Sequence, residues 1–393
     1  MTHLNSLLTI IKSLLYYVFD WLALLVPAPV QKSQFTIILL IRQDAIGDFI
    51  MWLDTAKEYR KLYPPEKYKI LLVGNKIWHD LAIKLPYWDK VIPVDLKQFK
   101  SFSNYRWRLM REIRKLKIHT AIQPTYSREF YNGDSLIRAS GAVRKVSSVG
   151  DMANRNWVKK FLADRWHTEL IPASTAPLTE LERNAEFFSG LTDNPHLTRY
   201  PKLDVKSLRL SPKWKEKIFY IIVPGTSGAV EGKEWPPNFF SELAKKIFRQ
   251  TGWVGIICGT KEEYGLGEII LKQCDAPLKN YCGQTSLIEL AGLLSQGKLT
   301  ISNDTGSVFL SSAVGTMSIC ILGGGHFGRF VPYPDLPGQA NYLQAVYYKM
   351  PCYGCNWSCI FPIIDGESAQ CISNISVGLV WEKICSLITN KNL

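Results

Sequence analysis

The stretch FTIILLIRQDAIGDFIMWLDTAKEYRKLYP (35–64) runs from an apolar segment directly into a segment with helical spacing. Its opening residues, FTIILLI, have the continuous apolar composition of a strand buried on both faces. Apolar residues then recur at helical intervals from Gly47 until Pro64 and Pro65 stop the helix. A buried strand followed by a helix is half of a β-α-β unit, so the stretch predicts a parallel sheet flanked by helices.

The same alternation continues along the chain and restarts after about residue 210. Further strands are expected at 68–74, 90–95, 119–124, 217–225, 253–259, 299–304 and 317–324, and further helices at 238–252, 286–297 and 307–315. A chain of 393 residues also exceeds the usual size of a single core. The sequence therefore predicts an α/β protein with two Rossmann-like domains, 35–195 and 210–385. A polar linker lies near 192–213, and the loops at the strand ends face a central cleft.

Composition identifies a folded protein with an anionic partner. The hydrophobic fraction of 47% and the charged fraction of 21% are those of a globular chain. The formal charge of +13 suits a membrane surface, a phosphorylated substrate or nucleic acid. The segment 96–119 carries eight lysines and arginines against one glutamate. It is either a solvated helix face or a site for anionic headgroups or a phosphorylated acceptor. No nucleic-acid-binding module accompanies it, so nucleic acid is not an expected partner.

The first thirty residues favour a membrane-associating helix. Residues 4–26 are long enough to cross a bilayer, but Lys12 and Asp20 share one side of the helix with Ser13. We expect residues 1–30 to form an amphipathic helix in the membrane interface, ended by the sequence PAP at 27–29. A transmembrane anchor and a helix packed on its own domain or a partner subunit remain open. Because the cysteines are few for a disulfide scaffold, a reducing cytoplasmic compartment is expected.

Two loops that follow predicted strands have the features of a diphosphate site. In VPGTSGAVEGKEWPPNFF (223–240), backbone amides around Gly225 and Thr226 precede Lys233. In ISNDTGSVFLSSAVG (301–315), Asp304, Thr305 and Gly306 open a helix whose first amides favour phosphate, and Asp304 can accept sugar hydroxyls. The competing interpretations are a surface loop that contains a lysine and an aspartate that only caps its helix.

The stretch 35–64, quoted at the start, contains the candidate general base. Asp48 stands at the start of the predicted helix, where the dipole favours its ionised form, and Gly47 allows close approach of a ligand. An ionised carboxylate facing a diphosphate site is suited to general-base catalysis, although a capping role also explains it. Asp44 is a weaker acceptor-side candidate and fits a loop-shaping role better.

Four cysteines gather near the C-terminus. Cys352, Cys355, Cys359 and Cys371 have a C-x2-C-x3-C-x11-C spacing that permits a structural zinc or iron site. A disulfide pair or four free cysteines are the alternatives.

Taken together, these motifs resemble glycosyltransferase family nine, the lipopolysaccharide heptosyltransferases. The resemblance rests on 39–64, ERNAEFF (182–188), the two phosphate-type loops and the late cysteines. It implies a GT-B fold and inverting sugar transfer without a catalytic cofactor. The implied donor is a nucleotide-sugar such as ADP-heptose, and the implied acceptor is a phosphorylated glycolipid of the lipopolysaccharide type. The protein is then expected on the cytoplasmic face of the inner membrane as a peripheral protein.

The resemblance also assigns roles to residues. Asp48 matches the general base, Lys233 the lysine on the donor phosphates, and Asp304-Thr305-Gly306 the donor-binding motif. Glu262 or Glu263 matches an acid near the nucleotide ribose. Phe309 replaces a histidine that is frequent in the family. Two other functions stay open: an inactive nucleotide-sugar-binding scaffold for a membrane assembly and a GT-B sugar-nucleotide epimerase.

Overall fold

The computed structural model describes residues 2–25, 34–206, 218–228, 230–364 and 366–389, with the side chains of the first helix described from residue 11 onward. The chain divides into two compact units. The first comprises Met1–Ala45, Asp54–Ala176 and Glu182–Thr198, and the second comprises Ile46–Leu53, Pro177–Leu181 and Arg199–Leu393. The proposed helix stop at 27–29 and part of the proposed linker lie outside the described residues.

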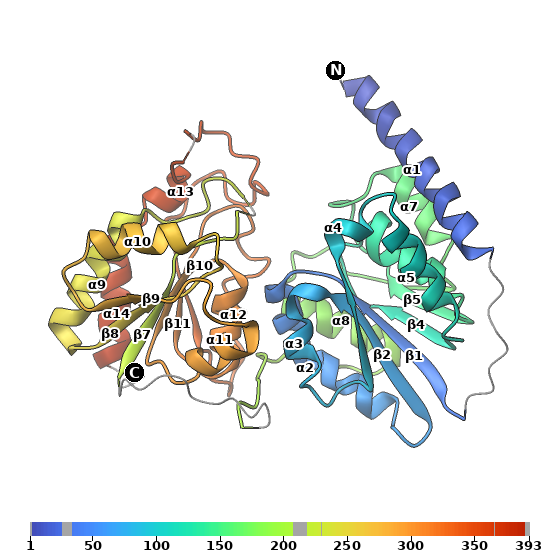
Figure 1. Cartoon of the computed structure of the whole chain (residues 1–393), viewed down its shortest axis with the longest axis horizontal. Coiled ribbons are helices and arrows are strands. Elements are labelled where there is room, and N and C mark those ends of the chain that lie inside the picture. Colours follow the sequence, from blue (N-terminus) through green and yellow to red (C-terminus); the bar gives the residue numbers. More distant parts are fainter. Residues whose placement is uncertain (1, 26–33, 207–217, 229, 365, 390–393) are drawn as a thin grey trace. The chain divides into compact units, whose positions relative to one another are not determined.

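The first unit is built on a parallel sheet with the strand order β3-β2-β1-β4-β5-β6 (Figure 1). Its strands are β1 (Thr36–Arg42), β2 (Tyr68–Asn75), β3 (Lys90–Val94), β4 (Thr120–Gln123), β5 (Arg144–Ser148) and β6 (Glu169–Ile171). The central strand β1 pairs with β2 and β4, and its buried apolar residues form the core of the sheet. The expected strand at 35–41 is therefore present, shifted by one residue.

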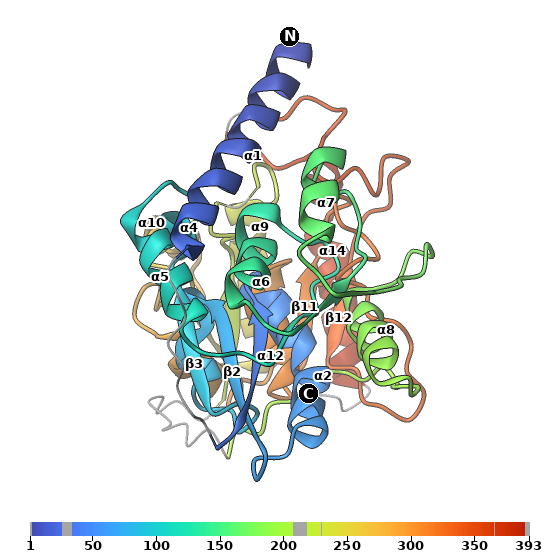
Figure 2. The same cartoon turned by 90° about the vertical axis from the view of Figure 1, so that its right-hand side faces the viewer.

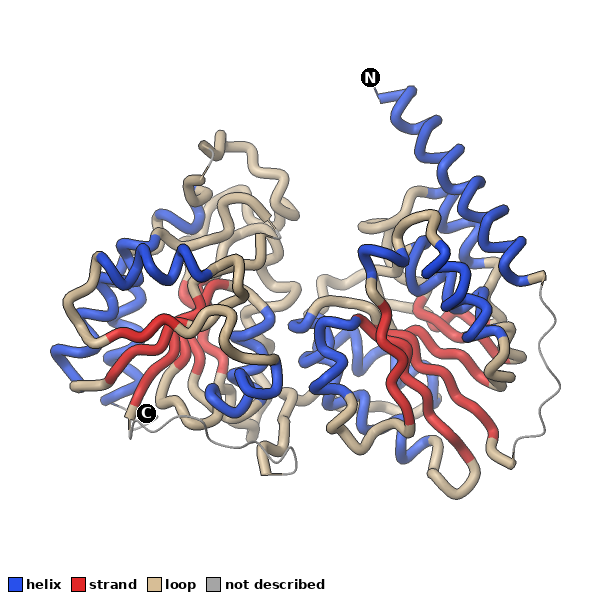
Figure 3. Tube along the Cα trace, viewed as in Figure 1, coloured by secondary structure: helices blue, strands red, loops and turns tan. Residues whose placement is uncertain are grey.

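Helices connect these strands, as a parallel sheet requires. The helices before β7 are α1 (Thr2–Leu24), α2 (Ile46–Leu62), η1 (Lys76–Trp78), α3 (His79–Ala82), α4 (Leu96–Phe99), α5 (Asn104–Arg114), the π-helix η2 (Phe130–Asp134), α6 (Ser135–Ser140), α7 (Trp157–Asp164) and α8 (Glu180–Thr192). Figure 3 shows the strands of each sheet between helices on its two faces.

The second unit repeats this architecture with the strand order β12-β11-β10-β7-β8-β9. Its strands are β7 (Phe219–Val223), β8 (Val254–Ile257), β9 (Leu278–Asn280), β10 (Thr300–Asn303), β11 (Ser318–Ile321) and β12 (Leu343–Val346). Its helices are α9 (Pro237–Thr251), α10 (Tyr264–Lys272), α11 (Leu287–Leu294), α12 (Gly306–Ala313), α13 (Gln370–Ser373) and α14 (Val377–Thr389). The two sheets confirm the predicted α/β class.

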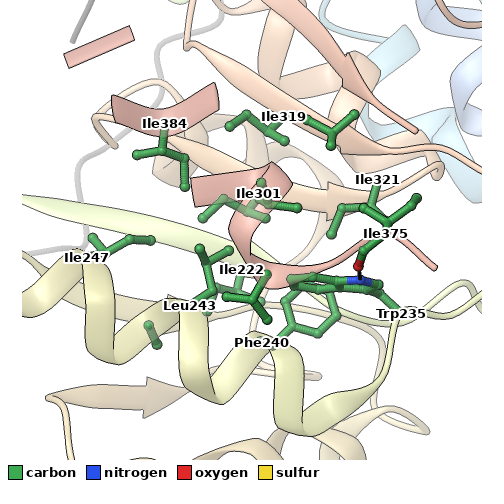
Figure 4. Close-up of a cluster of buried hydrophobic side chains, with 14 of the residues drawn as sticks. Ile222, Trp235, Phe240, Leu243, Ile247, Ile301, Ile319, Ile321, Ile375 and Ile384 are labelled. Carbon is green, nitrogen blue, oxygen red and sulfur yellow. Dashed lines mark hydrogen bonds between the residues drawn. The ribbon is translucent and has the colours of Figure 1, made fainter. Parts of the chain in front are cut away.

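A tryptophan anchors the core of the second unit. Trp235 is 1% exposed and packs edge-on against Phe240 of α9, among isoleucines of β7, β10 and β11 (Figure 4). Its indole Nε1 donates a hydrogen bond of 2.7 Å to the carbonyl of Ile375. A buried indole needs such an acceptor, so this bond fixes the chain immediately after Lys233.

Helix α1 packs on its own unit through its polar side. It packs against α5 and α6; Figure 1 shows it beside α5, and Figure 2 shows the same helix from the side. Asp20 and Ser13 are buried, and Asp20 accepts two hydrogen bonds from Arg106 of α5, at 2.7 and 2.6 Å. Of the interpretations left open by the sequence, the structure supports a helix packed on its own domain. No helix within the described part of the chain combines the length and apolar character needed to span a membrane.

The opposite side of α1 is apolar and exposed. Its side chains from residue 11 onward are between 44% and 58% exposed: Ile11, Leu14, Leu15, Val18, Trp21, Leu22 and Leu25. The helix is therefore amphipathic, as predicted, but its polar side is the one that faces the protein. We call the exposed side the α1 stripe.

Candidate active site

The predicted phosphate loops meet at one point of the second sheet. All strands of this sheet are parallel, and their order is β12-β11-β10-β7-β8-β9. From β7 the successive strands β8 and β9 lie on one side, and from β10 the successive strands β11 and β12 lie on the other, so the switch point lies between β7 and β10. Ligands of doubly wound sheets bind at such switch points, outside the carboxyl ends of the strands. The loops after β7 and β10 contain Gly225, Thr226 and Lys233 on one side and Asp304, Thr305 and Gly306 on the other. The structure thus brings these candidate residues together.

Lys233 and Asp304 form an ion pair at this switch point. The Lys233 Nζ lies 3.0 Å from an Asp304 carboxylate oxygen, and the two side chains are 14% and 5% exposed. Asn303, at the end of β10, holds the loop after β7: its side-chain oxygen accepts the backbone N–H of Trp235, and its amide donates to the Pro224 carbonyl. Thr305 is the N-cap residue of α12 and makes no side-chain capping bond. Asp304 is therefore not the N-cap residue that the competing interpretation required, and its carboxylate is instead paired with Lys233.

Two glutamates shape the loop after β7. The Glu234 carboxylate accepts hydrogen bonds from both the backbone N–H and the hydroxyl of Thr226, each 3.0 Å. The Glu263 carboxylate accepts the N–H groups of Ser227 and Thr260, each 2.7 Å, and so ties two loops together. A Cβ on Gly225 would come within 2.0 Å of the Glu263 carboxylate, which explains the glycine. Glu263 thus has a loop-holding contact, whereas the ribose contact of Glu262 or Glu263 stays a prediction.

Asp48 lies in the first turn of α2, and it is half-buried. The N-cap residue is Ala45, so Asp48 is not the capping residue that the alternative interpretation required. Ile46–Leu53 group with the second unit, which also contains α12. A Cβ on Gly47 would lie 2.8 Å from the Phe309 ring, and one on Gly306 would lie 2.7 Å from the Ile46 Cβ. Gly47 and Gly306 thus permit close packing of the first turns of α2 and α12.

Asp44 sits at the switch point of the first sheet, between β1 and β4. Its carboxylate pairs with the buried Arg42 at 2.5 Å and accepts the Thr125 hydroxyl at 3.3 Å. Arg42 also donates to the side-chain oxygen of Asn184, at 2.9 Å, within the ERNAEFF segment. The Asp44 carbonyl accepts the Trp78 indole N–H, at 3.0 Å. These contacts fit the loop-shaping role that the sequence suggested for Asp44.

Of the alternatives that the spacing of the four late cysteines permits, the described residues show free cysteines and not a four-thiolate site. All four are free cysteines, and within the described ranges no three His, Cys, Asp or Glu side chains are arranged to hold a metal ion. Cys371 is buried at the start of α13, where its sulfur accepts the Gly324 N–H. Burial raises the pKa of Cys371, and the nearby thiols of Cys352, Cys355 and Cys359 raise it further. The thiols therefore lie near one another as free side chains.

Sequence reasoning missed several polar side chains beside Asp44. Gln43, Gln123 and Asn132 are buried at or after the ends of β1 and β4. The sequence pattern gave them no role and placed Gln123 in the predicted strand 119–124, although an amide at the end of a buried strand, such as Gln43 or Gln123, could have indicated a polar site.

Comparison with known proteins shows what this chain is similar to in sequence and in fold. Residues 170–355 match the model of glycosyltransferase family 9 (heptosyltransferase). The resemblance to glycosyltransferase family 9 is thereby confirmed. Lipooligosaccharide heptosyltransferase 2 of Campylobacter jejuni is 24% identical over 172 residues, which are 43% of this chain and 51% of that protein. The chain thus matches only about half the length of this curated relative.

Solved structures share the fold of nearly the whole chain. The ADP-heptose lps heptosyltransferase II of E. coli has a TM-score of 0.65 at 17% identity, covering 91% of this chain and all of that one (100%). A family 9 glycosyltransferase from Veillonella parvula has a TM-score of 0.67 at 16% identity, with coverages of 92% and 99%. The dodecameric iron-containing heptosyltransferase TibC has a TM-score of 0.55 at 13% identity, with coverages of 92% and 78%. The chain has the GT-B fold of these proteins.

Proposed function

We propose that this protein is a glycosyltransferase of lipopolysaccharide or lipooligosaccharide core synthesis that transfers heptose from ADP-heptose by inversion. The observation that carries the proposal is the Lys233–Asp304 pair at the β7/β10 switch point of a GT-B fold. The family match over 170–355 and the heptosyltransferase relatives support the same activity.

The residues divide the chemistry between them. Asp48 takes the proton from the acceptor hydroxyl as its oxygen attacks the anomeric carbon. Lys233 and the backbone N–H groups near Gly225 and Thr305 stabilise the negative charge that develops on the departing diphosphate. Asp304 keeps Lys233 in place at 3.0 Å before the donor arrives and can accept hydrogen bonds from donor hydroxyls.

Nucleotide binding tests this proposal first. The thermal stability of the purified chain is measured with ADP, UDP, GDP and CMP. A ligand at a hundred times its Kd stabilises the folded state by about 2.7 kcal/mol, so ADP is expected to raise the Tm clearly. Lys233→Ala should lose this shift. Lys298→Ala is the matched control, because Lys298 is exposed and precedes β10 at the opposite end of the strand.

Product analysis then separates transfer from the alternatives. A transferase releases ADP in proportion to added acceptor, an epimerase converts the donor without acceptor, and a scaffold releases nothing. A rate of ADP release that is the same with and without lipooligosaccharide acceptor would therefore exclude transfer.

We also propose that the protein binds the cytoplasmic face of the inner membrane through the α1 stripe. Beside α1, a groove of about 350 Å³ on α5 is lined by Asn104, Trp107, Arg108 and Arg111. The Trp107 indole donates to the carbonyl of Phe19 on α1, which joins the groove to this helix. An apolar stripe next to arginines matches an anionic lipid surface.

Vesicle sedimentation tests the location. Leu15→Glu/Val18→Glu should abolish binding to phosphatidylglycerol vesicles, whereas Ile77→Glu, at another exposed apolar residue, should not. Arg108→Ala/Arg111→Ala should weaken binding to anionic vesicles by roughly tenfold to thirtyfold, since each basic residue contributes about 1 kcal/mol. Oligomers that dissociate in the Leu15/Val18 variant, without vesicle binding by the wild type, would show that a second copy covers the stripe instead.

A further inference from the structure

A small polar cavity opens at the switch point of the first sheet, where β1 and β4 end side by side. The polar side chains that line it are Gln43, Asp44, Gln123, Thr125, Glu129 and Asn132. Its volume is about 20 Å³, enough for one water-sized group such as a single hydroxyl. All of these residues belong to the first unit, so the cavity is defined within it.

Gln43 is a polar side chain without a partner in this cavity. The residue is 7% exposed, and neither its Nε2 nor its Oε1 has a hydrogen-bond partner. The side-chain oxygen of the neighbouring Asn132 is likewise buried and unpaired. A buried polar group without a partner costs roughly 1–3 kcal/mol, so two such groups around one cavity point to a ligand that satisfies them.

The charges around the cavity select the ligand. Two lining residues, Asp44 and Glu129, are carboxylates, and none of the lining side chains is lysine, arginine or histidine. The adjacent Arg42 is engaged by Asp44 and Asn184, and Lys100 pairs with Glu129 at 3.1 Å. A phosphate or carboxylate in the cavity would meet carboxylates whose cations are already engaged, and the lining side chains would supply it with no positive charge. A hydroxyl can donate to a carboxylate or an amide oxygen and accept from an amide N–H at the same time.

We propose that this cavity binds a hydroxyl of a neutral sugar unit of the acceptor, with Gln43 as the residue that recognises it. The inference rests on the proposed transferase function and specifies its substrate: the acceptor sugar held here carries neither phosphate nor carboxylate. The sugar hydroxyl accepts a hydrogen bond from the Gln43 Nε2 and donates its single proton to the side-chain oxygen of Asn132. Phosphate groups elsewhere on the glycolipid bind outside this cavity.

Acceptor kinetics test the proposal. The probes are lipooligosaccharides truncated to a neutral terminal sugar or to a terminal sugar acid. The wild type should use the neutral acceptor with at least tenfold higher kcat/KM. Gln43→Leu should raise the KM for the neutral acceptor about threefold to tenfold, the effect of one lost uncharged hydrogen bond, and should leave the KM for the nucleotide-sugar unchanged.

Two further variants make the result decisive. Gln43→Glu keeps the shape of the side chain, so it tests the site even where Gln43→Leu does not fold, and it should also raise the acceptor KM. Gln344→Leu on β12, in the other unit, is the control and should change neither KM. The inference is overturned if the acceptor KM is unchanged in both Gln43 variants, or if the wild type has the same kcat/KM for the acidic and the neutral acceptor. The cavity then holds only water. Absence of any transfer by the wild type instead overturns the proposed function itself.

Discussion

Removing the Asp20 carboxylate tests what fixes α1 to its unit. Asp20 and Arg106 are both buried, with side chains 2% and 0% exposed, and they are joined by two hydrogen bonds of 2.7 and 2.6 Å. In Asp20→Ala, the Arg106 guanidinium keeps its bonds to the Phe99 and Tyr131 carbonyls and to the Ser135 hydroxyl but loses its counter-charge. Breaking a buried ion pair by removing one partner costs roughly 3–5 kcal/mol. Since three neutral acceptors remain, we expect about 3 kcal/mol.

The loss in the free energy of unfolding of Asp20→Ala is measured by urea unfolding, followed by tryptophan fluorescence. The double variant Asp20→Leu/Arg106→Met removes both charges and should recover most of it, because well-packed apolar residues often replace a buried pair without penalty. Glu58→Ala, which breaks the pair with the largely exposed Lys61, is the control and should cost at most about 1 kcal/mol. A loss in Asp20→Ala no larger than in this control would refute the reasoning and mean that α1 is not held by the Arg106 pair.

Three other predictions concern catalysis, packing and pH. Asp48→Asn should lower kcat by roughly 10² to 10⁴ with the ADP-induced Tm shift retained, and equal losses of rate and donor binding would make Asp48 structural. Gly306→Ala should lower the free energy of unfolding by about 1–3 kcal/mol, because the added Cβ meets the Ile46 Cβ at 2.7 Å; Gly265→Ala on α10, where a Cβ meets nothing within 4 Å, should not. Burial lowers the pKa of His167 to about 3, with Nδ1 bonded to the Ala163 carbonyl and Nε2 to Arg128. Because the unfolded chain binds this proton near pH 6.5 and the folded chain does not, stability should fall as the pH drops from 7 toward 3, by up to about 1.4 kcal/mol per pH unit. Between pH 7 and pH 5, the free energy of unfolding measured with urea should fall by about 2 kcal/mol less in His167→Gln than in the wild type. Identical falls in the two proteins would contradict the lowered pKa of His167.

The strands that the sequence predicted are the buried, apolar ones. FTIILLI and YKILLVG became β1 and β2 almost residue for residue, because a strand covered on both faces must be continuously apolar. Among the strands that were not predicted, β5 (RKVSS) and β9 (LKN) are short or polar segments without a hydrophobic period. Their place in the sheet comes from pairing with β4 and β8, which a local pattern does not contain.

The loops of the candidate site could be located from the sequence for the same reason, because they follow buried strands. Glycines, Lys233 and Asp304 at strand ends carry a local signal, and the structure brings them together. The side of α1 that would face the protein was not predictable. Periodicity shows that Ser13 and Asp20 lie together, but the partner that buries Asp20 is Arg106, 86 residues away. The role of Gln43 likewise depends on Asn132, which lies in a different segment of the chain.

The position of the Glu263 carboxylate affects how a nucleotide-sugar would bind to the loop after β7. It occupies the N–H groups of Ser227 and Thr260, which are the kind of donors that a diphosphate would use. This side chain places a negative charge of the protein itself against these N–H groups and thereby holds the loop in shape. A nucleotide-sugar that takes the Ser227 N–H must expel this built-in competitor. Small stray anions such as inorganic phosphate, which bring too few additional contacts to do so, should be poor inhibitors.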